Sequence, residues 1–276
     1  MNQNTPIVIG GVGGSGTRLI AQILKELGYH LGNYLNLSED NLWFTLLFKR
    51  LDILNVSKTE FLLLTNILAK AISSPKPLTN KEIKLVDQLA DTVRTQHDKI
   101  VLGQMAESIK SNVNDKTKVN WGWKEPNSHV IVKQLKRCLP TMKYIHVIRN
   151  GIDMAFSENQ NQLIFWGKHY FKKELENTPE NSLKYWCRVH KELIVNTQSM
   201  KKDFYLLNFD EFCQDPKNGL DKLSQFFEMN LDSTKVKHLI SLVKPPKTIG
   251  RYKQQDISVF NTEDLAYVKH LGFDTT

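Results

Sequence analysis

The sequence predicts an α/β fold in which helices flank a mostly parallel sheet, and three observations support it. An apolar run over 7–9 leads into a glycine-rich turn and then into residues 19–27, whose apolar positions recur with helical spacing. Two later runs, 143–148 and 204–209, have the pattern of further buried strands. Helical patterns lie between these runs, as in chains whose parallel strands are joined by helices. The 276 residues fit one domain, 1–276, with a helical insertion over about 42–116.

The first strand, turn and helix predict a site for an anion. Glycines let the chain wrap closely, and the start of a helix presents backbone N–H groups and the positive end of the helix dipole. Gly11 and Gly16 are spaced almost as in a Walker A loop, but Thr17 stands where nucleotide triphosphatases have a lysine. Phosphate binding without ordinary ATP chemistry is therefore expected. The alternative is a glycine-rich turn without a ligand.

The insertion is predicted from three helical patterns, at 42–54, 59–72 and 79 to about 96. The third has a good N-cap in Thr79, with Glu82 three residues later. This insertion covers the core or shapes an acceptor pocket, and the two roles are compatible.

After the insertion we expect a strand over 118–123, followed by Lys124 on the turn at its C-terminal end. Pro126 disfavours α geometry at Glu125, and strand ends of this kind gather ligand-binding groups in open α/β sheets. An ordinary surface position is the alternative for Lys124. The remaining predicted elements are a helix at 128–138, a strand at 143–148, a helix at 179–200, a strand at 204–209 and a helix at 216–227.

Composition limits the classes of protein and partner. The net charge of +8 favours anionic partners, but the lysines are spread along the chain without a basic block, so no nucleic acid is expected. Solvated lysines account for much of this charge without any ligand. No run is long enough to span a membrane and we see no signal peptide. Three scattered cysteines suit a reducing compartment, so we expect a cytoplasmic enzyme.

Four segments together resemble the sulfotransferase family, most closely its tyrosylprotein branch and bacterial relatives. In chain order they are Gly13–Thr17, Trp123–Pro126, Val147–Gly151 with Ser157 beyond it, and Asn208–Pro216. The resemblance spans about residues 6–230. It implies a P-loop NTPase-like fold of the sulfotransferase type. It also implies transfer of a sulfuryl group from 3′-phosphoadenosine 5′-phosphosulfate (PAPS) to a hydroxyl acceptor.

The resemblance also implies roles for individual residues. The 5′-phosphosulfate end would be held by Gly13, Gly14, Ser15, Gly16, Thr17 and Arg18. Arg149 and Ser157 match the pair that binds the 3′-phosphate, and Lys124 matches a lysine near the sulfuryl group, where it would stabilise developing charge. The family usually has a cation just before the loop serine. That place is Gly14 here, so Arg18 is the candidate to supply the charge.

Two further segments resemble the family more weakly. Asp40 is the first candidate, and Glu39 the second, for the position where the tyrosylprotein branch has the base that accepts the hydroxyl proton. The alternative for Asp40 is a role as the N-cap of the following helix. Lys247 and Arg251 resemble cations of the basic glycine segment that closes over the 3′-phosphate. A polar surface loop is the alternative there.

Two other functions stay open at this point. A P-loop kinase or NTPase would use 206–211 as a Walker B strand, and a non-catalytic protein would bind nucleotide or polyanion only. No metal is expected, because no carboxylate cluster with ligand spacing accompanies the loop. The acceptor could be a carbohydrate, a small alcohol or phenol, a lipid or a tyrosine, and the oligomeric state is open.

Overall fold

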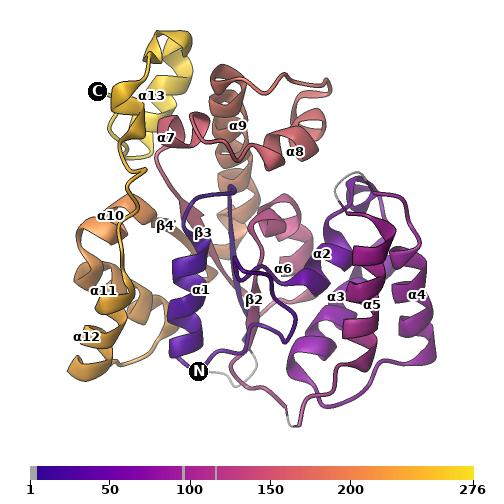
Figure 1. The fold of residues 1–276 in the computed structure, drawn as a ribbon. Coiled ribbons are helices and arrows are strands. Elements are labelled where there is room, and N and C mark those ends of the chain that lie inside the picture. Colours follow the sequence, from indigo (N-terminus) through magenta and orange to yellow (C-terminus); the bar gives the residue numbers. More distant parts are fainter. Residues whose placement is uncertain (1–4, 95–96, 116) are drawn as a thin grey trace. The chain divides into compact units, whose positions relative to one another are not determined.

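The computed structural model describes residues 5–94, 97–115 and 117–276 and has an α/β fold (Figure 1). The four strands of its sheet are β1 (Ile7–Gly11), β2 (Gly122–Lys124), β3 (Lys143–Ile148) and β4 (Phe204–Asn208), in the order β2-β1-β3-β4. β1 and β2 pair in parallel, with Ile9 opposite Lys124. The predicted α/β fold with a mostly parallel sheet is confirmed.

The strand predicted over 118–123 is shorter and later than expected. β2 is an edge strand whose partner β1 begins only at Ile7, opposite Gly122. Residues before Trp121 therefore find no ladder partner, and Trp121 itself makes only an isolated bridge with His30. Lys124 is the last residue of β2 rather than part of the following turn.

The chain forms two compact units. The first comprises Met1–Ile9 with Ile20–Tyr144, and the second comprises Gly10–Leu19 with Ile145–Thr276. The organisation of 1–276 as one domain stays a prediction.

The first unit contains the helical segment that the sequence placed over about 42–116. Its helices are α2 (Leu42–Phe48), the 3₁₀ turn η1 (Leu51–Leu54), α3 (Lys58–Ser73), α4 (Asn80–Ala90) and α5 (Lys99–Ser111), followed after β2 by η2 (Pro126–Ile131) and α6 (Val132–Cys138). α5 was not predicted as a separate helix. α5 packs against both α2 and α4 (Figure 1).

Two predicted helices of this unit differ from the structure. The helix expected over 42–54 breaks after Phe48, because Arg50 adopts an extended conformation (φ −151°, ψ 145°). The helix from Thr79 has the predicted capping box but ends at Ala90. Its predicted end at Gln96 lies outside the described residues, as does the predicted end of the insertion at 116. Residues 128–138 form 3₁₀ turns up to Ile131 before α6 begins.

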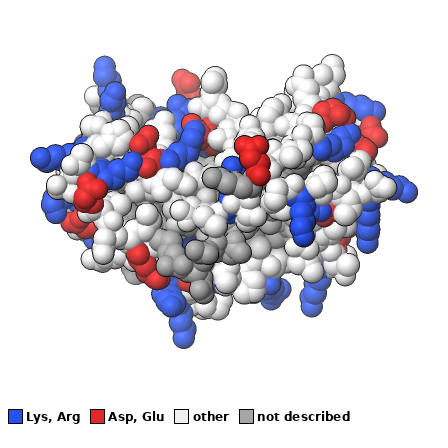
Figure 2. Space-filling view, turned by 90° about the horizontal axis from the view of Figure 1, so that it is seen from below, with Lys and Arg blue, Asp and Glu red and all other residues white. Residues whose placement is uncertain are grey.

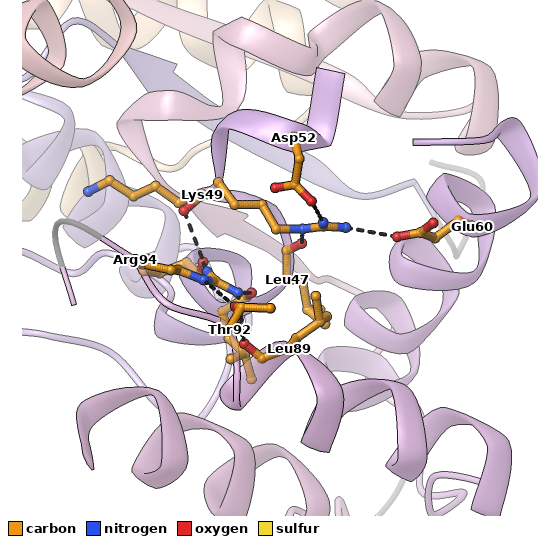
Figure 3. A network of polar contacts seen from close by, with 10 residues as sticks. Leu47, Lys49, Asp52, Glu60, Leu89, Thr92 and Arg94 are labelled. Atoms are coloured by element: carbon orange, nitrogen blue, oxygen red, sulfur yellow. Dashed lines mark hydrogen bonds and ion pairs between the residues drawn. The ribbon is translucent and has the colours of Figure 1, made fainter. Parts of the chain in front are cut away.

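Two arginines hold the break after α2 in place (Figure 3). The guanidinium of Arg94, which follows α4, donates to the carbonyl oxygens of Thr45 at 3.0 Å and Leu46 at 2.6 Å. Arg50 donates to the Glu60 carboxylate at 2.9 Å. Burial lowers the pKa of Arg94 to about 10. The carbonyl of Thr45 also accepts from the N–H of Lys49. Leu46 contributes one of the carbonyl groups that the end of a helix leaves without an intrahelical partner, and Arg94 supplies its donor.

The second unit is built around α9 (Pro179–Thr197), which packs against α7 (Gly151–Ala155), α8 (Asn161–Phe171) and α13 (Thr262–His270). Its other elements are α10 (Phe209–Gln214), α11 (Pro216–Phe227), α12 (Ser233–Leu242) and the 3₁₀ turns η3 (Gln198–Asp203), η4 (Arg251–Gln254) and η5 (Ile257–Val259). α1 (Thr17–Glu26) begins in this unit.

The predictions for the second unit hold unevenly. The helix at 216–227 is confirmed, and the helix at 179–200 ends at Thr197 and continues as a 3₁₀ turn. α7 requires glycine at 151, because a Cβ there would lie 2.7 Å from the Trp186 ring. The helices α7, α8, α10, α12 and α13 were not predicted, and the strand predicted over 204–209 ends at Asn208 because Phe209 begins α10.

The surface carries mixed charge. On the face drawn in Figure 2, lysines and arginines are interspersed with aspartates and glutamates rather than gathered into one block. Within the described residues, no helix combines the length and the apolar character needed to cross a bilayer.

Candidate active site

The glycine-rich loop between β1 and α1 belongs to the second unit and has a shape that only glycine allows. Gly14 and Gly16 have φ of +90° and +95°. A Cβ on Gly16 would lie 2.2 Å from the ring of Phe209, so a side chain fits neither the backbone conformation nor the space. Left-handed residues within such a turn direct neighbouring N–H groups toward a common anion.

Two polar side chains of this loop are buried. Ser15 is 1% and Thr17 is 5% exposed. The Oγ of Ser15 has no hydrogen-bond partner among the described residues. A buried hydroxyl without a partner costs free energy that a bound anion can recover. The buried, unpaired hydroxyl therefore favours the phosphate-binding hypothesis for this loop over the alternative of a turn without a ligand. Arg18 lies exposed on the first turn of α1.

The loop begins against the end of β3. A Cβ on Gly11 would lie 2.7 Å from the carbonyl oxygen of Val147, so glycine permits a close approach of the two chains. The side chain of Gln162 on α8 donates to the carbonyl of Gly11 at 3.3 Å. The glycine-rich loop and the end of β3 thus lie side by side within one unit.

Arg149 follows β3 and is 5% exposed. Its Nη2 donates to Thr248 Oγ1 at 2.9 Å and lies 3.7 Å from an oxygen of Asp153, while its Nε lies 3.7 Å from Asp210 Oδ1. That last distance is too long for a hydrogen bond, and neither Nε nor Asp210 Oδ1 has such a partner among the described residues. Burial lowers the pKa of Arg149, against the opposing effect of the two carboxylates. The guanidinium therefore keeps donor capacity for an anion.

Asp153 holds the segment that contains Lys247 and Arg251. Its two carboxylate oxygens accept from the backbone N–H groups of Gly250 at 2.7 Å and Tyr252 at 3.0 Å. The guanidinium of Arg251 donates to the carbonyl of Phe156 at 3.3 Å. The structure thus brings Arg251 close to α7, whereas Lys247 is exposed.

Ser157 lies just beyond α7 and is half-buried. Its Oγ accepts from the backbone N–H of Asn159 at 3.3 Å. The side chain of Asn159 lies against the glycine-rich loop, since a Cβ on Gly13 would be 3.6 Å from its Nδ2. Asn159 therefore contacts both Ser157 and this loop.

Lys124 and Asp40 form an ion pair in the first unit. The Nζ of Lys124 donates to Asp40 Oδ1 and, at 2.9 Å, to the carbonyl oxygen of Ser38. The backbone carbonyl of Lys124 accepts from Asn41 N–H at 2.8 Å. Lys124, at the end of β2, therefore holds the segment 38–41 through both its backbone carbonyl and its side-chain ammonium.

Two sequence alternatives for this pair are wrong. Lys124 is not a surface lysine, because it is only 2% exposed. Asp40 is not the N-cap of α2, because Asn41 takes that role and its Oδ1 accepts from Phe44 N–H at 2.9 Å. Glu39, the second candidate base, has a positive φ of 66° and pairs with Lys25 at 2.9 Å. The structure therefore brings Asp40, and not Glu39, to Lys124.

Sequence reasoning gave no role to Glu125, which is 2% exposed. Its carboxylate accepts from the backbone N–H of Asn127 at 2.6 Å and from its side-chain amide at 2.7 Å. Burial raises the pKa of Glu125, and the nearby charge of Lys49 opposes that shift. Glu125 is a positioning residue that fixes the turn after Lys124.

Three partners of Arg149 were also missed as site residues. Asp153 lies on α7, four residues after Arg149, which precedes the N-cap of that helix. Asp210 was part of the segment Asn208–Pro216 and of a possible Walker B strand but had no role of its own, and its Oδ2 accepts from Asn150 N–H at 2.9 Å. Burial raises the pKa of Asp210. Thr248 carries no signal in the sequence, because only folding brings it near Arg149.

Comparison with known proteins assigns the family. Residues 6–233 match the family model described as the sulfotransferase family. The chain belongs to the sulfotransferase family. As a sulfotransferase it is an enzyme that transfers a sulfuryl group from PAPS to a hydroxyl acceptor. No curated protein matches the sequence.

Solved sulfotransferase structures share the fold at low identity. The sulfotransferase domain from the curacin biosynthetic pathway is similar with a TM-score of 0.52 and 15% identity, over 99% of this chain and 99% of that one. The sulfotransferase STF9 from Mycobacterium avium is similar with a TM-score of 0.50 and 12% identity, over 100% of this chain and 78% of that one. At such identities the likeness establishes the fold alone.

Proposed function

We propose that the second unit binds the donor nucleotide and that Lys124 and Asp40 of the first unit carry the chemistry. The phosphate loop, with Gly13, Gly14, Ser15, Gly16, Thr17 and Arg18, binds the 5′-phosphosulfate end. Arg149 and Ser157 bind the 3′-phosphate, and Lys247 and Arg251 add charge there. One observation carries this assignment. Ser15 Oγ and Arg149 Nε are buried and have no hydrogen-bond partner in the described part of the chain, and their residues follow β1 and β3, which approach each other closely at Gly11 and Val147.

In this proposal the residues of the chain bind the donor, stabilise the negative charge that develops during transfer and accept the proton of the acceptor hydroxyl. PAPS supplies the sulfuryl group, which leaves the donor phosphate for the acceptor oxygen. The ammonium of Lys124 stabilises negative charge that grows as this bond breaks. The carboxylate of Asp40 takes the proton of the acceptor hydroxyl. Ser38 and Asn41 keep both groups in place through the contacts described above.

We also propose a cytoplasmic location and no nucleic-acid partner. Cys138, Cys187 and Cys213 are all free thiols, which agrees with a reducing compartment. Cations and acids are interspersed on the face shown in Figure 2, a pattern that does not favour a polyanion on that face.

The test is transfer of label from radiolabelled PAPS to a panel of carbohydrates, phenols, alcohols, lipids and tyrosine peptides, with and without a chelator. We expect at least one class to accept label, and the same rate with the chelator. Hydrolysis of ATP with Mg²⁺ without PAPS binding would instead identify a P-loop kinase or NTPase. Affinity for heparin without affinity for PAPS would identify a non-catalytic polyanion binder.

A further inference from the structure

The first unit has an open groove that neither Lys124 nor Asp40 lines. It encloses about 330 Å³ between η1, the start of α3 and the end of α6. Its walls are mostly apolar, and they include Ile53, Leu54, Val56, Phe61 and Leu62. A volume of this size falls within the range of small-molecule sites.

The apolar lining is open to a ligand. Ile53 and Phe61 form buried surface, with 2% and 4% exposure, whereas Leu62 is 43% exposed although leucine favours burial. The thiol of Cys138 also lines the groove and is free. The apolar surface of the groove therefore has a buried part, formed by Ile53 and Phe61, and an exposed edge at Leu62.

The charges of this groove have one sign. Among the described residues that line the groove, only Lys58 and Arg137 are charged, and both are exposed. Neither forms an ion pair within the described ranges. Lys58 is the first residue of α3, where the helix dipole adds positive potential, and Arg137 comes from α6. Two elements thus each place an unpaired cation beside an apolar groove.

We propose that this groove binds an anionic amphiphile, namely an alkyl chain with a single carboxylate, sulfate or phosphate head. The chain lies along the apolar wall and the head meets Lys58 and Arg137. A helix of a protein partner or a second copy of this chain would also cover apolar surface. The enclosed volume and the two cations favour the small amphiphile.

The binding test uses three ligands of equal chain length: decanoate, decanol and decyltrimethylammonium. Their binding is followed by calorimetry and by protection of Cys138 from iodoacetamide. Cys187 and Cys213 serve as internal references, because they are only 2% and 6% exposed. We expect saturable binding and Cys138 protection by decanoate, at least about tenfold weaker binding of decanol, and none of the cation. Octanoate should bind more weakly by about fourfold for each CH₂ removed.

Two variants test the role of the cations. The double variant Lys58→Glu with Arg137→Glu should weaken decanoate binding by tenfold or more, whereas Lys84→Glu, on exposed α4 surface, should leave it unchanged. Unchanged thermal melting and nucleotide binding would show that the double variant is folded. Equal affinity of the parent protein for decanoate and decanol would overturn the proposal. An equal loss of decanoate affinity in the double variant and in Lys84→Glu would also overturn it. So would a dimer that Leu62→Glu dissociates, or binding of an acidic amphipathic peptide without binding of decanoate.

Discussion

The ammonium of Lys124 and the carboxylate of Asp40 form an ion pair across 84 residues of sequence. The side chain of Lys124 is 3% exposed and that of Asp40 is 22% exposed, so the pair has a buried cation and a solvent-accessible carboxylate. This arrangement suits the roles proposed for them, because the carboxylate must reach an acceptor from solution. It also means that replacing either residue leaves the other without its partner.

Lys124→Ala should lower kcat by about 10²–10³, because it removes a cation that stabilises transition-state charge. Affinity for adenosine 3′,5′-bisphosphate should hardly change, because the residues proposed to bind it lie in the other unit. Single-turnover rates and calorimetry measure the two effects. Lys84→Ala is the matched control. A loss of kcat below about fivefold would exclude Lys124 as the catalytic cation.

Asp40→Asn should lower kcat by about 10²–10⁴, the contribution typical of a general base. Glu39→Gln should change kcat little, because Glu39 pairs with Lys25 instead of Lys124. The pH profile of kcat distinguishes a carboxylate that acts as the base from one that only positions other groups. The acidic limb should be present in the parent enzyme and in Glu39→Gln, and absent from the residual activity of Asp40→Asn. An unchanged limb in Asp40→Asn would assign the base elsewhere.

Arg149→Ala should remove most of the preference for adenosine 3′,5′-bisphosphate over 5′-AMP. Losing a charge-assisted hydrogen bond of about 1.5–3 kcal/mol corresponds to a change of about 10- to 150-fold in affinity. Arg188→Ala, an exposed arginine on α9, is the control and should keep the preference. Equal affinity of the parent protein for both nucleotides, measured by calorimetry, would refute the 3′-phosphate assignment.

Glu125 predicts a pH dependence of stability. Burial raises the pKa of Glu125, so the folded state disfavours the charged carboxylate. The stability it contributes is fully present below its unfolded pKa of about 4.3 and is lost as pH rises through the higher folded pKa. Glu125→Gln should therefore flatten the fall in stability on going from about pH 4 toward neutral pH. Urea unfolding across that range measures it, and an equally steep fall in the variant would contradict it.

Arg94→Met should lower the free energy of unfolding by about 2–4 kcal/mol, because the carbonyls of Thr45 and Leu46 lose charged donors. Methionine keeps part of the apolar side chain, which limits the change to the guanidinium. Arg188→Met is the control, since an exposed substitution usually costs less than about 0.5 kcal/mol. Urea unfolding compares the two variants. A similar loss in both would show that the Arg94 bonds add little.

Local patterns predicted those parts of the protein that neighbouring residues decide. The strand, glycine turn and helix predicted at the start of the chain are present, because strand composition, glycine geometry and helical spacing are all short-range. The same holds for the capping box at Thr79 and for α11. The bounds of the first strand and helix differ slightly: β1 extends to Gly11 instead of ending at residue 9, and α1 begins at Thr17, two residues before the predicted start of 19–27. The shortened β2 was missed because its length depends on where β1 offers a partner.

By itself the sequence determined the α/β class, the glycine-rich turn between β1 and α1 and the family resemblance, since each depends on residue types at short and ordered spacings. Only the tertiary structure decided that Asp40 rather than Glu39 meets Lys124, and that Thr248 meets Arg149 across 99 residues. A local change in backbone direction, such as the positive φ of Glu39, changes which side chain of a segment reaches a distant partner. Such pairs depend on packing between elements, and spacing along the chain does not encode that packing.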